Sequence, residues 1–189
     1  VMFAPFLAPI FAFLIVLSRK ENSLAWLRTG FILTGGLFLS LFIFALLLGY
    51  LITLLPEARA VYLGSLAAPD YPSLLRAAFT RRVENPGAWL TLASFLVLNL
   101  GLISTFFPRR IASSQPEGTS QSQSDPGQAL KAYLLVIAAI AALLVTAPEF
   151  VYLRDQFGWR MNTIFKFYYQ AWLLWSITAA AAVILLLAQ

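Results

Sequence analysis

Residues 31–55 read FILTGGLFLSLFIFALLLGYLITLL, a stretch without a single charged side chain. A helix rises about 1.5 Å per residue and the core of a bilayer is about 30 Å thick, so roughly 20 apolar residues span it. Residues 31–55 exceed that length, which allows a tilted helix. The pair Gly35-Gly36 predicts a point where a neighbouring helix approaches closely.

Four further apolar runs approach the same length, at residues 2–17, 89–107, 130–147 and 171–188. Of the 189 residues, 60% are hydrophobic and 11% are charged, whereas a soluble domain carries about 45–50% apolar and about 25% charged residues. Because backbone polar groups in lipid must bond within the segment, these runs are expected to be helices. The sequence therefore predicts an all-α, polytopic protein of the cell membrane, with about five transmembrane helices and short interfacial helices.

The composition also excludes several kinds of site. The chain has no cysteine and no histidine, which removes disulfides, thiolate metal sites and the commonest general base. The net charge of +5 is expected near anionic lipid headgroups, so no nucleic-acid partner is needed to explain it.

The connections between the runs differ in character. Residues 18–28 are short and basic, and residues 111–128 are rich in Ser, Gln, Pro and Gly, which predicts a disordered loop. With five spans these two connections share one side, and residues 56–88 and 148–172 share the other. The two sides carry six and seven cations, so the positive-inside rule does not decide the orientation by count. We place the disordered loop in the cytoplasm because Arg109 and Arg110 directly follow a span.

The chain opens at Val1 inside an apolar run with no basic segment before it, which is not the pattern of a signal peptide. We expect residues 1–189 to be the C-terminal membrane region of a longer protein. A missing N-terminal region or a partner subunit would then contribute to function.

The connection PEFVYLRDQFGWRMNTIFKFYYQAW, residues 148–172, concentrates polar and aromatic side chains. Thr146 and Glu149 have the spacing of a capping box, which predicts a short helix over 147–157 that ends at Gly158. A second helix is predicted to begin near Asn162 or Thr163 and to run into the last span.

At helical spacing, Asn162, Lys166 and Gln170 form one polar stripe. A lysine among amides and tyrosines at a membrane boundary suits the phosphate or pyrophosphate of a lipid. Arg154 and Arg160 would close on the same anion. The alternative is that these aromatic and basic residues only anchor the chain at the interface. Asn162, Gln170 and the carboxylates of Glu149 and Asp155 are not typical anchors, which favours a site.

The stretch EFVYLRDQFGWRMNTIFKFYYQAW, residues 149–172, resembles the signature of the uncharacterised "YYY" family of polytopic membrane proteins. That family is grouped with the GT-C glycosyltransferases. The resemblance implies a multi-spanning enzyme that uses a polyprenyl-phosphate sugar donor at the outer membrane face. Its motif maps onto Glu149, Arg154, Asp155, Arg160, Asn162, Lys166, Tyr168, Tyr169 and Gln170.

GT-C enzymes usually carry an essential carboxylate in their first outer loop, and nothing in this chain matches that loop. There is also no Asp-x-Asp pair, so no motif supports a divalent cation and no cofactor is predicted.

A second basic segment lies in residues 69–89, where an amphipathic helix is predicted from about Pro72 to Val83. Arg81 and Arg82 are candidates to hold the phosphate of the donor, and Asp70 and Glu84 are weak candidates for a base. Ordinary snorkelling of arginine near headgroups favours the simpler interpretation of a surface-lying connector.

Two functions follow from these patterns. In the first, a glycosyltransferase uses Glu149 or Asp155 as the catalytic carboxylate and the cations neutralise the departing phosphate. In the second, a non-enzymatic membrane subunit binds lipid or a partner protein through the aromatic stretch. A transporter or channel is less favoured because no ionisable residue lies in the middle of a span.

Overall fold

The computed structural model describes residues 3–21, 24–65, 68–83, 86–106, 126–151 and 161–188. Within these ranges the chain forms helices and no strands, in the order α1 (Ala4–Ser18), α2 (Ala25–Leu54), α3 (Pro56–Ser65), α4 (Tyr71–Val83), α5 (Pro86–Phe106), α6 (Pro126–Phe150) and α7 (Met161–Leu187). Four of them, α2, α5, α6 and α7, are long and apolar enough to cross a membrane, and α1 is a shorter apolar helix. The predicted all-α polytopic class is confirmed.

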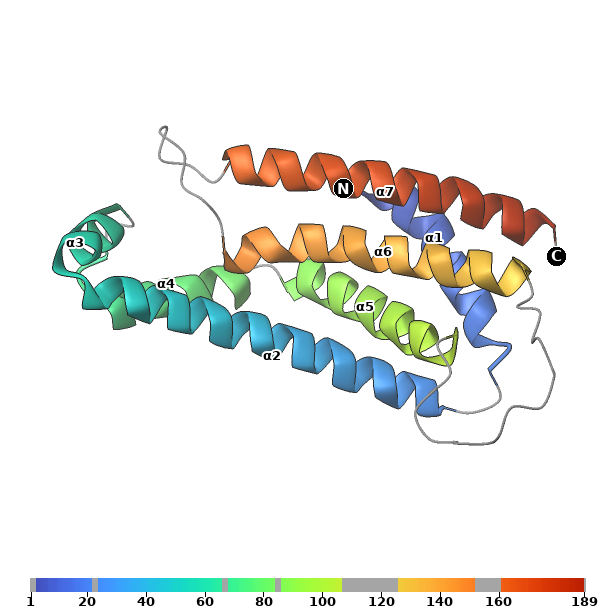
Figure 1. The fold of residues 1–189 in the computed structure, drawn as a ribbon, viewed down its shortest axis with the longest axis horizontal. Helices are drawn as coiled ribbons and strands as arrows, with labels where there is room; N and C mark the ends of the chain where they lie inside the picture. The colour runs from blue at the N-terminus through green and yellow to red at the C-terminus, as the bar shows by residue number, and fades with distance from the viewer. Residues whose placement is uncertain are drawn as a thin grey trace, which may run out of the picture.

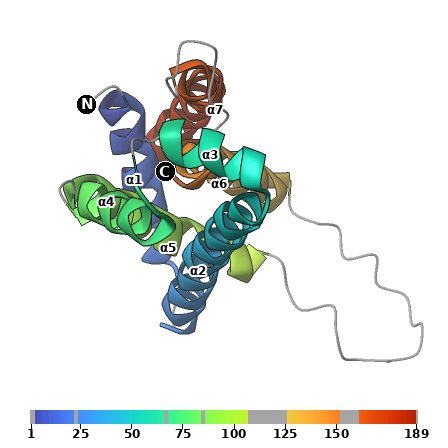
Figure 2. The same cartoon turned by 90° about the vertical axis from the view of Figure 1, so that its left-hand side faces the viewer.

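The four long helices run side by side along the length of the molecule, and α3 and α4 lie together at one end (Figure 1). At that end α2 and α6 finish and α5 and α7 begin. Figure 2 looks onto it and shows α3 crossing from the end of α2. We call it the α3–α4 end. The helix ends that the connections 56–88 and 148–172 join thus lie at one end of the bundle, as the count of five spans predicts.

Prolines set several helix boundaries. Leu55 is extended, with φ −93° and ψ 114°, because the ring of Pro56 disfavours the helical conformation of the residue before it. The chain therefore leaves α2 and starts α3 at Pro56, which suits a first helical position. Pro126 likewise begins α6, so residues 126–128 of the predicted disordered loop are helical, and the rest of that loop lies outside the described residues.

The core lies between α1, α5, α6 and α7. Phe95 of α5 contacts Phe11 of α1 and Trp175 of α7, with ring centroids 5.5 and 5.8 Å apart. The indole Nε1 of Trp175 donates a hydrogen bond of 3.2 Å to the carbonyl oxygen of Ala138 in α6. Buried alanines on α6 and α7, among them Ala142 and Ala171, let these two helices pack closely, as small residues do in membrane bundles.

The second helix contributes little to this core. Its buried residues are Trp26, Gly30, Thr34 and Gly49, and most of its large apolar side chains are exposed. Such a surface suits contact with lipid tails, which are as apolar as the side chains themselves.

The prediction that a neighbouring helix approaches closely at Gly35-Gly36 is wrong. No atom lies within 4 Å of a Cβ built on either residue. The close crossing involves Gly30 of α2 and Gly101 of α5, where a Cβ on Gly101 would meet the Trp26 carbonyl oxygen at 2.7 Å. The sequence shows that glycines permit an approach, but not which face of the helix meets a neighbour.

Candidate functional site

The last turn of α6 carries Glu149. The predicted capping box at Thr146 is wrong, because α6 continues unbroken from Pro126 to Phe150. The Thr146 hydroxyl donates 2.7 Å back to the Ala142 carbonyl oxygen instead of accepting from a following N–H. Val151 N–H extends the helix with a 2.9 Å bond to the Ala147 carbonyl oxygen. The rest of the helix predicted over 147–157 lies outside the described residues.

Pro148 sits inside this last turn and is buried. Because proline has no N–H, the helix loses one i→i−4 hydrogen bond there. The Thr146 hydroxyl bonds the Ala142 carbonyl oxygen, so it does not replace that bond. The turn that presents Glu149 is therefore held by the packing of the buried Pro148 and by the next backbone bond, from Val151 N–H to Ala147.

Glu149 meets Tyr168 across the α6–α7 junction. The Tyr168 hydroxyl donates to Oε1 of Glu149 at 3.4 Å, and both side chains are partly buried. A hydroxyl–carboxylate bond is normally 2.5–3.0 Å in length, so this long contact orients the carboxylate more than it stabilises it. A bond of this kind often tightens only when substrate is bound.

The aromatic ring of Phe3, just before α1, covers the base of this pair. Phe3 contacts the ring of Tyr168 edge-on at 5.5 Å and the ring of Trp175 at 5.0 Å. Three helices, α1, α6 and α7, thus fix the position of the Tyr168 hydroxyl. The Glu149–Tyr168 pair thus brings two of the predicted site residues into contact.

The predicted polar stripe lies on another face of α7. Asn162, Lys166 and Gln170 are all exposed. With 3.6 residues per turn, each residue is rotated by about 100° from the one before it, so residues two apart are rotated by about 200°. Lys166 therefore points about 160° away from Tyr168 around the helix axis. The stripe therefore does not share a pocket with Glu149 within the described residues.

A ladder of exposed aromatic rings runs beside the stripe. Phe165 and Tyr169 stack with centroids 6.4 Å apart, and Tyr169 and Trp172 stack at 6.5 Å. Phe6 of α1 closes the ladder with an edge contact to Trp172 at 5.6 Å. We call Phe165, Tyr169 and Trp172 the aromatic ladder. The ladder was not predicted as a unit, although the spacings i, i+4 and i+7 place these three residues on one face.

The remaining predicted site residues cannot be placed around Glu149. Arg154, Asp155 and Arg160 lie outside the described residues. Arg81 and Arg82 belong to the last turn of α4, but the structure does not describe their side chains. Among the described residues there is also no group of three or more acidic, histidine or cysteine side chains that could hold a metal ion.

Comparison with protein families gives one match. The model described as "Uncharacterized membrane protein (DUF2298)" matches residues 1–175. The chain belongs to the DUF2298 family. No curated protein and no solved structure matches it.

Membership in DUF2298 agrees with the four spanning-length helices, and together they identify a multi-pass membrane protein. The matched region runs from the start of the chain into the middle of α7. It therefore includes Glu149, Tyr168, the stripe and the aromatic ladder.

Proposed function

We propose that this DUF2298 chain is the C-terminal membrane part of a GT-C-like glycosyltransferase that takes its sugar from a polyprenyl phosphate at the outer membrane face. The observation that carries the proposal is the contact between Glu149 and Tyr168 at the α3–α4 end of the bundle. It holds a carboxylate, partly shielded from water, at the end of two membrane-length helices. The resemblance of residues 149–172 to the "YYY" signature gives the reaction class.

Transfer of a sugar from a lipid phosphate needs a base for the acceptor hydroxyl. As the acceptor oxygen bonds to the anomeric carbon, the bond from that carbon to the phosphate oxygen breaks and the hydroxyl proton moves to the base. We assign the base to Glu149, with Tyr168 as the residue that positions it. Asp155 is the second candidate for this role, since it follows Glu149 closely in the chain.

The departing phosphate needs cations. Arg154 and Arg160 occupy the connection between Glu149 and α7, so they are the proposed phosphate ligands at the carboxylate. Arg81 and Arg82, in the last turn of α4, are proposed as further ligands from the neighbouring connection.

Lys166 serves an earlier step, because it points away from Tyr168. Together with Asn162 and Gln170 it offers one cation and two amides beside the aromatic ladder. Isoprenoid chains pack on aromatic faces and phosphates bind lysine as a point charge. This outer face of α7 is the proposed place where the donor docks from the bilayer before it reaches Glu149.

Two variants of the full-length protein separate these roles. Vesicles with polyprenyl-phosphate-linked [14C]mannose or [14C]glucose and native membrane acceptors report transfer, and polyprenyl phosphate in nanodiscs reports binding. Glu149→Gln is expected to lower transfer by more than about 100-fold, in the range of a lost general base, while binding persists. Lys166→Met is expected to weaken binding. Lys131→Met, at the opposite end of α6, is the matched control. Full transfer by the Glu149→Gln variant would refute the assignment.

A second candidate function is favoured by the exposure of α2. Phe31 and Ile32 are 61% and 62% exposed, and the open space above Gly35 and Gly36 leaves room for a partner helix. In that case the chain is a non-enzymatic subunit that binds lipid or another membrane protein. Purification in a mild detergent with a stoichiometric second chain, and without bound lipid phosphate, would favour this function over the enzyme.

A further inference from the structure

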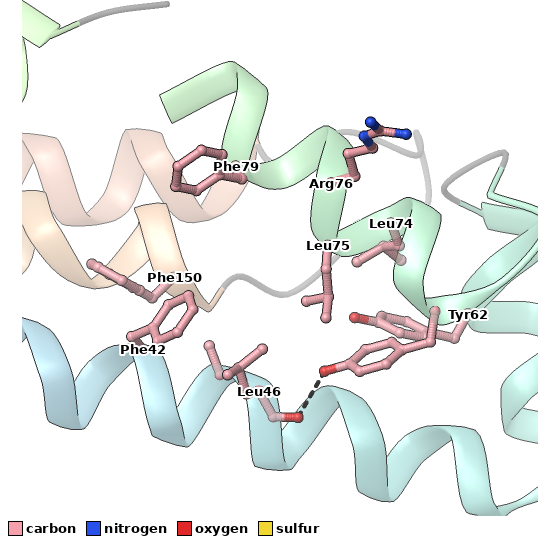
Figure 3. A pocket seen from close by; sticks show the side chains of 10 residues that line it. Phe42, Leu46, Tyr62, Leu74, Leu75, Arg76, Phe79 and Phe150 are labelled. Carbon is pink, nitrogen blue, oxygen red and sulfur yellow. Dashed lines mark hydrogen bonds between the residues drawn. The ribbon is translucent and has the colours of Figure 1, made fainter. Parts of the chain in front are cut away.

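A cavity of about 450 Å³ lies under α4 at the α3–α4 end of the bundle. Its walls come from the last half of α2, from α3, from α4 and from the last residue of α6 (Figure 3). The lining side chains are almost all aromatic or aliphatic, including Phe42, Leu46, Leu74, Leu75, Phe79 and Phe150. Apolar residues of the amphipathic helix predicted from about Pro72 to Val83 thus face this space.

Two tyrosines hold α3 and α4 over α2 and so form the cavity. The Tyr71 hydroxyl donates 2.8 Å to the Leu46 carbonyl oxygen, as the dashed line in Figure 3 shows. A Cβ on Gly49 would lie 2.9 Å from the hydroxyl of Tyr71 and 3.3 Å from that of Tyr62, so a larger residue there would push the two tyrosine side chains aside. Burial raises the pKa of Tyr71, which keeps the donating hydroxyl protonated.

This cavity suits an apolar occupant. It opens to the surface, since Phe42 and Phe79 on its walls are 48% and 67% exposed, and its apolar walls offer water few hydrogen-bond partners. Its size lies within the range of specific ligand sites, about 300–1,000 Å³. At about 30 Å³ for a group the size of a water molecule, it holds roughly 15 methylene-sized groups. That is about the length of one fatty-acyl chain, whereas a long polyprenyl chain would extend well beyond the cavity.

Arg76 marks where the polar end of the occupant lies. It is exposed and lines the edge of the cavity, and in Figure 3 its guanidinium points away from Leu46 and Tyr62. An amphipathic helix with its arginine outward lies at the level of the headgroups. Guanidinium binds phosphate with two parallel hydrogen bonds. An anionic lipid is favoured over a zwitterionic one because its headgroup has no cation that would repel the guanidinium.

We propose that this cavity binds one acyl chain of an anionic phospholipid, whose phosphate is held by Arg76. The site is separate from the outer face of α7, and its occupant is a resident lipid instead of the sugar donor. Because Phe150 lines it and follows Glu149 directly, the bound chain packs against the turn that presents the carboxylate.

The test uses the full-length protein in nanodiscs with a phosphatidylglycerol probe that carries a photoreactive diazirine at the end of its acyl chain. We expect the probe to label peptides that contain Phe42, Leu75 or Phe150, and to label them at least about fivefold more than the same probe with a phosphatidylcholine head. Ala45→Phe, which fills the cavity, is expected to remove this labelling. Ala60→Phe, on an exposed part of α3 outside the cavity, is the matched control for added bulk.

Arg76→Gln is expected to abolish the preference for phosphatidylglycerol, whereas Arg59→Gln, an exposed arginine of α3, is expected to retain it. Equal labelling by both headgroups would overturn the role of Arg76. Labelling unchanged by Ala45→Phe, or competition by polyprenyl phosphate but not by phosphatidylglycerol, would overturn the acyl-chain site. The Lys166→Met and Glu149→Gln variants are expected to label normally, so the proposal can fail or hold independently of the proposed glycosyl transfer.

Discussion

Gly30 of α2 and Gly101 of α5 cross so closely that neither position has room for a side chain. A Cβ on Gly30 would lie 3.2 Å from the Cα of Gly101, and a Cβ on Gly101 would lie 2.7 Å from the carbonyl oxygen of Trp26. These contacts are with backbone atoms, which cannot rotate away. The crossing therefore determines how near α2 can come to the rest of the bundle.

Gly101→Ala is expected to force α2 and α5 apart and to lower the free energy of unfolding by about 1–3 kcal/mol, the usual cost of overpacking. Thermal unfolding in detergent measures this as a lower midpoint temperature. Gly35→Ala, five residues from Gly30 in open space, is the control and is expected to keep or slightly raise the midpoint, because alanine favours a helix over glycine. A midpoint for Gly101→Ala that is no lower than that of the wild type would mean that the two helices do not cross at these glycines.

Asn99 in α5 is fully buried, and in the described part of the chain neither its amide nitrogen nor its amide oxygen has a hydrogen-bond partner. An unsatisfied buried polar group costs about 1–3 kcal/mol. Asn99→Leu, of similar size, is expected to raise the midpoint of thermal unfolding. The exposed Asn162 serves as the control position, where the same substitution should have little effect. A lower midpoint for Asn99→Leu would indicate that the amide is bonded in the membrane.

Asp70 caps the N-terminus of α4. Its Oδ1 accepts a hydrogen bond of 2.8 Å from the backbone N–H of Ser73. This bond is the larger cause, and a bond with the Ser73 side chain the smaller, that lowers the pKa of Asp70 below its usual 3.8. Because the folded pKa is depressed, the ionised cap stabilises α4 fully above the unfolded pKa. That contribution is lost as the pH falls through the folded pKa.

Hydrogen exchange of residues 71–83, corrected for intrinsic rates, tests the cap. Asp70→Ala is expected to exchange faster than wild type at neutral pH because the cap is lost. As the pH falls below 3.8 and through the lowered pKa of the folded protein, the difference is expected to narrow, because the wild-type carboxylate then takes up a proton. A difference that stays constant from pH 7 to pH 3 would show that the charge of Asp70 has no part in it.

The features of the fold that could be predicted from the sequence are those that depend on residues close together in the chain. The starts of α4 at Tyr71 and α7 at Met161 lie within one or two residues of the predicted positions, because Pro72 and the change from polar to apolar residues near Asn162 are local signals. Helix α3 was not predicted, since Pro56–Ser65 carries no apolar run of spanning length. The Thr146 capping box failed because the same hydroxyl can bond backward inside a continuing helix.

In the candidate site, too, features set by nearby residues were predictable and contacts between helices were not. Glu149 and Tyr168 were both predicted site residues, but their contact depends on how α6 packs on α7, which the sequence does not specify. The separation of Lys166 from Tyr168, by contrast, follows from the helical period alone.

The Tyr168 hydroxyl supplies the last prediction. Tyr168→Phe removes the 3.4 Å bond to Glu149 but keeps the ring that packs on Phe3, so the midpoint of unfolding should change little. A hydrogen bond to a charged group contributes about 1.5–3 kcal/mol at best, and this one is long. If Glu149 is the base of the proposed transferase, we therefore expect glycosyl transfer to fall by about tenfold in kcat with the KM for the donor unchanged, because the proposed role of Tyr168 is to position that base and not to bind the lipid. Tyr133→Phe, an exposed tyrosine of α6, is the matched control. If Tyr168→Phe instead raised the KM and left kcat intact, Tyr168 would belong to the donor site, and the positioning role assigned to it would be wrong.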